Sequence, residues 1–409
     1  MAGDGHRSGF SSFFSEGQYQ TQAETIFVEQ KKRNITIGIP TEDTLQENRI
    51  ALVPNSVRTL VNYGHKVIVE RGAGIKSNFS DHDYSEAGAE ITDSREEVFS
   101  SQVLVKAAPP TMEEIEMCHK DQMILSPLHL PVLNQEFIQA LQKKHITTIA
   151  MEYYKSEDGS FPVVRIMSEI AGMSAMLTAA ELLSSVNGGR GVLLGGVSGV
   201  PPAKVVILGA GVVGEFATKT ALGLGASVRI FDNEVSKLMR IQSLVGRQLH
   251  TSTYNPVYLG YQLMSADVVI GAVHSRSGRA PILVTEEMIS KMKNGSVAID
   301  VSIDQGGCFE TSKLTNHKTP TFEEHGVIHY CVPNIASKVP RTASVAISNI
   351  VTPILIKAGN TGNFDNLLFE NRGVRNGVYT YKGCVTNAYI AKSFNLKYTD
   401  IDLLLTSKF

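Results

Sequence analysis

Residues 204–232 read Lys-Val-Val-Ile-Leu-Gly-Ala-Gly-Val-Val-Gly-Glu-Phe-Ala-Thr-Lys-Thr-Ala-Leu-Gly-Leu-Gly-Ala-Ser-Val-Arg-Ile-Phe-Asp. β-forming residues 205–208 meet a glycine turn, and a helical pattern then runs to Leu224, where Gly225 ends it. A second apolar strand closes on Asp232. This stretch predicts one βαβ unit of a doubly wound α/β fold, and the context makes its glycine pattern specific.

Three glycines of the turn have separate physical roles. Gly209 permits the tight turn, Gly211 lets the backbone approach a pyrophosphate, and Gly214 lets the helix pack close to its strand. The helix N-terminus offers free N–H groups to that phosphate. The stretch therefore predicts a dinucleotide site, and the alternative is a unit whose glycines serve packing alone.

The acid at the end of the second strand selects the dinucleotide. Asp232 can accept hydrogen bonds from a ribose 2′-hydroxyl and would repel a 2′-phosphate, and the next residues, Asn233 and Glu234, include no arginine. We therefore expect NAD rather than NADP as the cofactor.

Length and composition restrict the class of protein. A chain of 409 residues is too long for one ordinary core, which predicts two domains. The 38 basic and 40 acidic residues give a net charge of −2, which argues against nucleic-acid or membrane-surface partners. The four cysteines stand apart and suggest no zinc site or disulfide framework, so we expect no metal. No secretory signal or apolar run of membrane-spanning length is evident, so the cytoplasm follows by elimination.

The order of patterns predicts how the domains are arranged. Residues 1–34 read as an extension, either a tail or an arm that docks on a partner subunit. Strand and helix patterns alternate from Ile35, a long helix starts near Met167 with Ser168 as its N-cap, and helical sequence returns after residue 340. We expect two Rossmann-like α/β domains, with an NAD-binding domain (166–340) inserted into a discontinuous substrate domain (35–165 and 341–409). The cleft between them is the expected substrate site.

Several longer motifs resemble those of a known family. Residues 40–54 (Pro-Thr-Glu-Asp-Thr-Leu-Gln-Glu-Asn-Arg-Ile-Ala-Leu-Val-Pro) and 303–310 (Ile-Asp-Gln-Gly-Gly-Cys-Phe-Glu), with 167–172, 188–202 and 330–342, are similar to alanine dehydrogenases. The wider group includes the NAD-binding subunit of proton-translocating transhydrogenase. The resemblance covers the chain from about Ile35 to its end, and it implies reversible NAD-dependent oxidation of L-alanine to pyruvate and ammonia in a homo-oligomer, a hexamer or a dimer.

The resemblance also implies roles for individual residues. Arg49 matches the arginine that binds the substrate carboxylate, His129 the acid/base histidine and Asp304 a second catalytic residue. The positions expected to contact the dinucleotide are Ser168, Gly209, Gly211, Val212, Val213, Gly214, Asp232, Lys237, Val273, Val301 and Asn334.

One position departs from the family pattern. Alanine dehydrogenases have Lys-x-Lys-Glu-Pro after a short strand, and the second lysine binds the substrate keto or amino group. This chain has Lys106-Ala107-Ala108-Pro109-Pro110, so Ala108 replaces that lysine. If the strand continues through Lys106 and Ala108, both side chains leave the same face, and Lys106 is then a candidate substrate-binding residue.

The candidate catalytic residues also have structural alternatives. A guanidinium can bind a carboxylate through two parallel hydrogen bonds, but Arg49 could instead form a surface ion pair with Glu47, Glu42 or Asp43. His129 could move protons near neutral pH or simply occupy a Pro-bounded turn. Asp304 follows a strand of the nucleotide domain, where ligands bind, or begins an Asx-turn.

Four functions therefore stay open from the sequence. The first is an alanine dehydrogenase, and the second is a related dehydrogenase for another small 2-amino or 2-keto acid. The third is an NAD-binding homologue without turnover. The fourth is a transhydrogenase subunit, which the presence of His129 and Asp304 disfavours.

Overall fold

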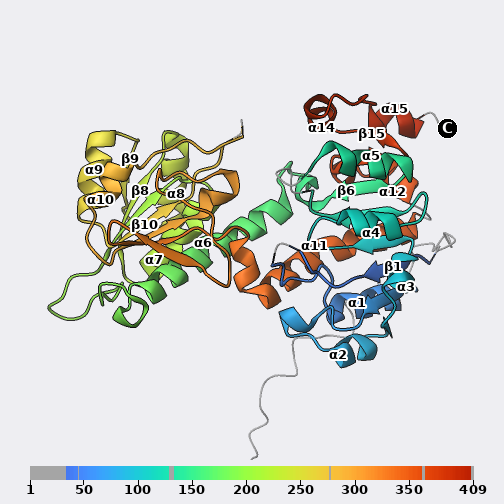
Figure 1. The fold of residues 1–409 in the computed structure, drawn as a ribbon, viewed down its shortest axis with the longest axis horizontal. Helices are drawn as coiled ribbons and strands as arrows, with labels where there is room; N and C mark the ends of the chain where they lie inside the picture. The colour runs from blue at the N-terminus through green and yellow to red at the C-terminus, as the bar shows by residue number, and fades with distance from the viewer. Residues whose placement is uncertain (1–33, 45, 129–132, 276–277, 362–363, 407–409) are drawn as a thin grey trace, which may run out of the picture.

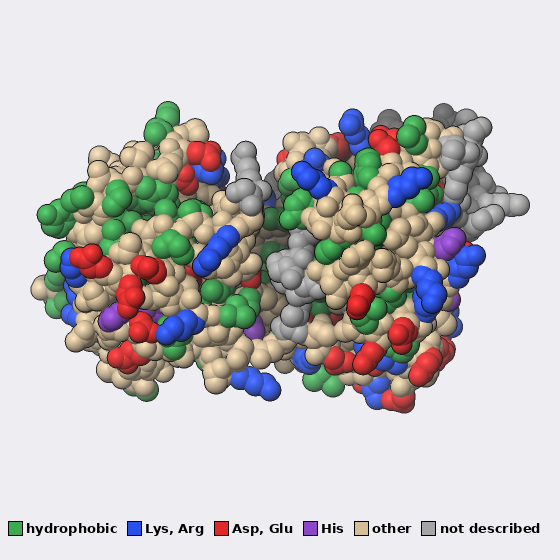
Figure 2. Space-filling view, turned by 45° about the horizontal axis from the view of Figure 1, so that its top comes forward, with side chains coloured by type: hydrophobic (Ala, Val, Ile, Leu, Met, Phe, Trp, Pro, Cys, Tyr) green, Lys and Arg blue, Asp and Glu red, His purple; other side chains and the backbone are tan. Residues whose placement is uncertain are grey.

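The computed structural model describes residues 34–44, 46–128, 133–275, 278–361 and 364–406. Two lobes are joined by two long helices, α6 (Pro162–Leu182) and α11 (Pro340–Asn360), as Figure 1 shows. Each lobe is built around one sheet, and a furrow separates the lobes on the surface (Figure 2). Residues 1–33 of the expected extension (1–34) lie outside the described residues.

The first sheet has the order β15-β14-β6-β5-β4-β1-β2-β3. Its six parallel strands follow the 3-2-1-4-5-6 order of a Rossmann-like fold, and β14 and β15 extend it antiparallel. The strands are β1 (Thr36–Ile39), β2 (Lys66–Glu70), β3 (Glu90–Thr92), β4 (Val103–Val105), β5 (Met123–Ser126), β6 (Thr147–Ala150), β14 (Val378–Tyr381) and β15 (Cys384–Val385).

The second sheet has the order β12-β13-β11-β10-β7-β8-β9, and only β12 is antiparallel. Its parallel part repeats the same strand order. The strands are β7 (Lys204–Leu208), β8 (Ser227–Phe231), β9 (His250–Ser252), β10 (Val268–Gly271), β11 (Val297–Asp300), β12 (Thr321–Glu324) and β13 (Val327–Tyr330). The expected fold class is thus confirmed, because strands from both ends of the chain share one sheet and the middle of the chain forms the other.

Helices cover both faces of each sheet. On the first sheet these are α1 (Pro54–Asn62), α2 (Asp81–Glu86), α3 (Arg95–Phe99), α4 (Met112–Met117), α5 (Gln135–Lys143), α12 (Phe364–Glu370), α13 (Arg372–Arg375), α14 (Ala388–Ser393) and α15 (Ile401–Thr406). On the second they are α7 (Val212–Gly223), α8 (Val235–Val245), α9 (Pro256–Met264) and α10 (Glu286–Ser290). Single 3-10 turns complete the chain: η2 (Ile75–Ser77), η4 (Met151–Tyr153), η5 (Ser185–Asn187), η6 (Val301–Gln305) and η7 (Ile335–Lys338).

The start of the long helix differs from the expectation. Helix α6 begins at Pro162, so Ser168 lies inside it and is not its N-cap. Proline at the first helical position fixes a helical φ and needs no N–H partner, so this end forms without a capping side chain. The predicted N-cap was therefore wrong by about two turns.

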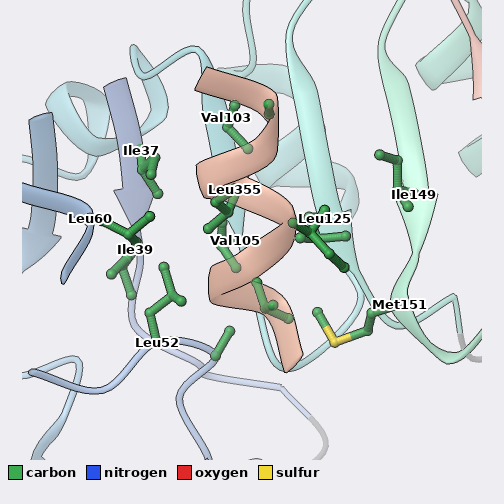
Figure 3. Close-up of a cluster of buried hydrophobic side chains, with 14 of the residues drawn as sticks. Ile37, Ile39, Leu52, Leu60, Val103, Val105, Leu125, Ile149, Met151 and Leu355 are labelled. Carbon is green, nitrogen blue, oxygen red and sulfur yellow. The ribbon is translucent and has the colours of Figure 1, made fainter. Parts of the chain in front are cut away.

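Helix α11 contributes to the core of the first lobe. Leu355 packs among β-strand side chains such as Ile37, Val105 and Leu125, as Figure 3 shows. All four side chains are buried, and Leu355 comes from the far end of the chain. The C-terminal segment therefore completes the core of the N-terminal sheet, as expected for a discontinuous domain.

Helices α6 and α11 are also long and apolar enough to cross a membrane by length and composition, which the sequence analysis did not anticipate. About half of each apolar window (50% and 56%) is buried inside the protein. Core helices pass the same test, so these two helices are weak indications of a membrane span.

Two glycines of helix α7 provide a matched test of the packing that shapes the dinucleotide unit. A Cβ on Gly214 would lie 1.8 Å from the carbonyl oxygen of Gly209, whereas a Cβ on Gly223 would meet nothing within 4 Å. We expect Gly214→Ala to lower the free energy of unfolding by about 1–3 kcal/mol or more. Gly223→Ala should leave it unchanged or raise it by up to about 1 kcal/mol. Urea unfolding of both variants measures this, and equal midpoints would contradict the packing described.

Candidate active site between the two sheets

A cavity of about 500 Å³, the first cavity, lies between the two lobes. Apart from residues of α6 and α11, its lining residues follow the carboxyl ends of strands in both sheets. Arg49 follows β1 and Ala107 follows β4, on either side of the point where the strand order of the first sheet reverses. Gly211 follows β7 and Ala272 follows β10, at the matching point of the second sheet. Ligands of doubly wound folds bind at such points, and here two of them open into one cavity.

Arg49 is held by a buried carboxylate. Its Nε and Nη2 donate to the two oxygens of Glu47 at 2.7 and 2.5 Å, and the side chains are 11% and 2% exposed. The third nitrogen, Nη1, lies 3.1 Å from the sulfur of Met167 in the cavity wall. Of the three carboxylates that the surface alternative named, Glu47 is the partner of Arg49, but the pair is buried in the cavity wall and not on the surface.

The charges of this pair stabilise each other. Burial alone disfavours both charges, but the neighbouring carboxylates of Glu47, Glu42 and Asp304 raise the pKa of Arg49 above its usual value. For Glu47, burial is outweighed by Arg49 and by hydrogen bonds, which hold its pKa below the usual value. Arg49 is therefore a permanent cation with one edge fixed and another edge facing the cavity.

Residues after β13 fix Glu47 from the other side. Asn334 Nδ2 donates to Glu47 Oε2 at 2.9 Å, and Ser337 Oγ donates to Oε1 at 3.2 Å. Three serines on this part of the chain also accept hydrogen bonds from the Arg49 loop. They are Ser337 from Asn48 N (2.9 Å), Ser344 from Ile50 N (2.9 Å) and Ser348 from Val53 N (3.0 Å).

The glycine turn has the shape that a dinucleotide needs. Gly209 has φ +105°, and a Cβ on it would lie 2.2 Å from Ala272 O. A Cβ on Gly211 would meet no atom within 4 Å, so the space beside this glycine is open. Asp232 Oδ2 accepts from Ala210 N at 2.7 Å, which places the carboxylate next to the turn. The turn therefore has room for a pyrophosphate, and the carboxylate that was predicted to bind a ribose lies next to it.

The loop that carries Asp304 is shaped by a buried carboxylate. Asp300, the last residue of β11, accepts from Ser302 N (2.9 Å), Cys308 N (2.8 Å) and Ser312 Oγ (2.6 Å). Burial nevertheless raises its pKa above the usual value. These bonds fold η6, so Asp304 lies in the cavity wall with Arg49.

Lys106 lies elsewhere. Strand β4 ends at Val105, so the premise that Lys106 and Ala108 share one strand face is wrong. The Lys106 side chain is 1% exposed, and its Nζ lies 3.0 Å from Glu42 Oε2 and 2.9 Å from Glu114 Oε1. Glu42 Oε1 accepts from Ala107 N at 2.5 Å. Lys106 does not line the first cavity, nor a second cavity that adjoins it. Its contacts instead stabilise the loop that follows β4.

The other predicted residues have the following positions. Those lining the first cavity with Arg49 and Asp304 are Ser168, Gly211, Val212, Val213, Val273, Val301 and Asn334. Gly209 and Gly214 shape the turn behind it, and Lys237 pairs with Glu234 at 2.7 Å, outside the lining. His129 lies outside the described residues. All these roles stay predictions.

Sequence reasoning missed several residues near Arg49. Met167 and Glu152 line the first cavity, and Glu152 Oε1 accepts from Leu128 N at 2.7 Å. His317 and Ala108 both line the second cavity. No local pattern marks these residues, because segments far apart in the chain bring them together.

Comparison with known proteins identifies the family. The model of the alanine dehydrogenase/PNT N-terminal domain matches residues 38–171, and that of the C-terminal domain matches residues 175–388. The chain is 42% identical over 367 residues to alanine dehydrogenase 2 of Staphylococcus aureus (strain USA300), which covers 90% of this chain and 98% of that protein.

Two solved structures are also similar. An L-alanine dehydrogenase matches with a TM-score of 0.83 and 40% identity over 88% of this chain and 99% of that one. A transhydrogenase from Sinorhizobium meliloti matches with a TM-score of 0.74 and 26% identity over 87% of this chain and 99% of that one.

The buried acid beside the cavity predicts a pH dependence of stability. Burial raises the pKa of Glu42 from its usual 4.5 to about 7, although Lys106 opposes the shift. Between these values the folded protein binds more protons than the unfolded chain, so this group's contribution to stability falls as the pH rises. The fall amounts to about 3 kcal/mol in total.

Glu42→Gln should remove this part of the pH dependence. Urea unfolding between pH 5 and pH 7.5 measures the slope, and Glu113→Gln, on the exposed side of α4, is the control. Equal slopes in the parent protein and in Glu42→Gln would refute the assignment.

Proposed function

Because the chain belongs to the alanine dehydrogenase/PNT family, we propose that it is an NAD-dependent oxidoreductase that interconverts L-alanine and pyruvate. The oxidative direction converts L-alanine, NAD⁺ and water into pyruvate, ammonium, NADH and a proton. The observation that supports this most is the position of Arg49, a permanently charged guanidinium in the wall of a cavity that also contains the glycine turn.

Arg49 is the residue that binds and orients the substrate carboxylate. Glu47 fixes one edge of the guanidinium, so the remaining N–H groups have a defined direction before substrate arrives. A preorganised donor loses little side-chain entropy on binding. Glu47 therefore orients the guanidinium and still leaves some N–H groups of Arg49 available to the substrate carboxylate.

Proton transfer falls to His129 and Asp304. Removing a hydride from the carbon that bears the amine leaves an imine, water attacks it, and each step moves a proton. A histidine titrates in the range that this chemistry needs. Asp304 shares the cavity wall with Arg49, where a carboxylate can orient the attacking water and stabilise positive charge on the imine.

The residues of the second sheet would hold NAD⁺, which supplies the hydride acceptor. The turn at Gly209 and Gly211 would take the pyrophosphate, and Asp232 would take the ribose, which favours NAD over NADP. Val273 and Val301 would form apolar walls of the same cavity.

Two further properties belong to the proposal. The protein acts in the cytoplasm on a small-molecule substrate, and it assembles as a homo-oligomer, a hexamer or a dimer. A second candidate function, a dehydrogenase for another 2-amino or 2-keto acid, is favoured by one observation. Ala108, at the position of the family lysine, lines a cavity together with Arg49.

The proposed activity has a direct test. Purified protein with NAD⁺ and L-alanine should produce NADH, measured as absorbance at constant pH, and pyruvate with ammonium should consume NADH. Pyruvate without ammonium is the control. No change in absorbance in either direction, with NAD binding shown by calorimetry, would select an NAD-binding protein without turnover.

Arg49→Lys should separate substrate binding from cofactor binding. A lysine cannot make the two parallel hydrogen bonds, and such a loss costs about 1.5–3 kcal/mol, which corresponds to roughly 10- to 200-fold in kcat/KM. We expect KM for alanine to rise while the Kd for NAD⁺ stays within about twofold. An unchanged KM would show that another group binds the carboxylate.

A further inference from the structure

A second cavity of about 340 Å³ lies against the first. Five residues line both cavities: Arg49, Ala107, Pro127, Asp304 and Asn334. The second cavity is lined by no residue of the glycine turn. Ala108 lines the second cavity but not the first. Arg49, the proposed carboxylate-binding residue, thus lies at the junction of the two cavities. The cofactor would occupy the first cavity, and the second would remain available to the substrate.

We infer that this second cavity is a side-chain subsite, and that the enzyme prefers L-2-amino acids with uncharged aliphatic side chains larger than the methyl group of alanine. The inference rests on the proposed dehydrogenase function and deepens it. It concerns the substrate class only, because the hydride and proton steps are the same for every such amino acid.

The arrangement of groups on the reacting carbon supports this assignment. That carbon carries a hydrogen, an amine, a carboxylate and a side chain. Arg49 lines both cavities, so a carbon whose carboxylate is on Arg49 and whose hydrogen is directed into the first cavity has the second cavity as neighbouring space for its side chain. At roughly 30 Å³ per water, its volume equals about eleven waters, more than a methyl group fills.

The wall of the second cavity suits an apolar side chain. Ala108, Pro109 and Val332 are buried, and Leu314, 72% exposed, lies at the rim. A longer side chain at position 108 would project from this wall, so the alanine itself keeps the space open.

The charges around the cavity argue against a charged substrate side chain. The charged residues among its described lining are Glu47, Arg49 and Asp304, and Glu47 already accepts from Arg49, Asn334 and Ser337. Burial lowers the pKa of His317, so this imidazole is neutral at neutral pH. A charged side chain would lose its water here without a dedicated partner.

The parent protein should show a rising series. Each methylene buried in an apolar site contributes about fourfold in kcat/KM. We expect kcat/KM to increase by about that factor from L-alanine to L-2-aminobutyrate and again to L-norvaline, with L-glutamate and L-lysine the poorest substrates. A fall at each step, with alanine the best substrate, would overturn the inference while leaving the dehydrogenase function intact.

Two variants test whether the second cavity is responsible. Ala108→Leu fills the space and should lower the norvaline-to-alanine ratio of kcat/KM at least tenfold. Leu314→Ala removes an exposed rim side chain and should lower the same ratio about threefold to tenfold. The matched control is Leu403→Ala on α15, where the leucine is 68% exposed and lines neither cavity, and its ratio should stay unchanged.

The outcomes separate the two levels of the proposal. If Ala108→Leu and Leu314→Ala both keep the parent ratio, the side chain binds elsewhere and the subsite is refuted. If the parent protein oxidises no amino acid although it binds NAD⁺, the dehydrogenase function is refuted and the subsite falls with it.

Discussion

The buried pair of Arg49 and Glu47 is the interaction on which the site depends. Glu47 accepts hydrogen bonds from a guanidinium on its own loop and from Asn334 and Ser337. These two residues lie 287 and 290 positions further along the chain. A buried carboxylate in such a place is stable only if every part of it is paired. The same contacts that satisfy this charge therefore fix the loop after β1 against the segment that leaves the second sheet.

Two equivalent folds meet at this interaction. Each sheet has the 3-2-1-4-5-6 order and places its ligand-binding loops where that order reverses. Helices α6 and α11 connect the lobes (Figure 1), and the two reversal points open into one cavity. The second sheet then contributes the glycine turn, whose backbone could bind a phosphate. The first sheet contributes Arg49, whose guanidinium could bind a carboxylate. A redox reaction between two bound molecules needs this arrangement, because the reacting atoms must lie next to each other.

The sequence predicted features whose physical cause is local. The glycine turn is one, because Gly209, Gly211 and Gly214 each answer a requirement within one βαβ unit. The two-sheet architecture is another, because alternating patterns and the return of helical sequence after residue 340 indicate it. The start of α6 was predicted wrongly because the helix begins with a proline and without a capping side chain. Ser168, the predicted N-cap, lies inside the helix.

The site was less predictable where it depends on distant contacts. Arg49 was expected either at a substrate or in a surface pair with Glu47, and only the fold shows that this pair is buried in the cavity wall. Lys106 was expected beside Ala108, but β4 ends before it, and its charge is balanced by Glu42 and Glu114. Glu114 is only 8 positions from Lys106, but Glu42 is 64 positions away, so no sequence pattern near residue 106 encodes that partner.

The most direct measurement is a crystal structure of the protein with NAD⁺ and pyruvate bound. The account predicts that the pyruvate carboxylate accepts from Arg49 at about 2.7–2.9 Å. It also predicts that the keto carbon faces the nicotinamide in the first cavity and that the methyl group points toward Ala108. A carboxylate bound away from Arg49, or a nicotinamide outside the first cavity, would contradict it.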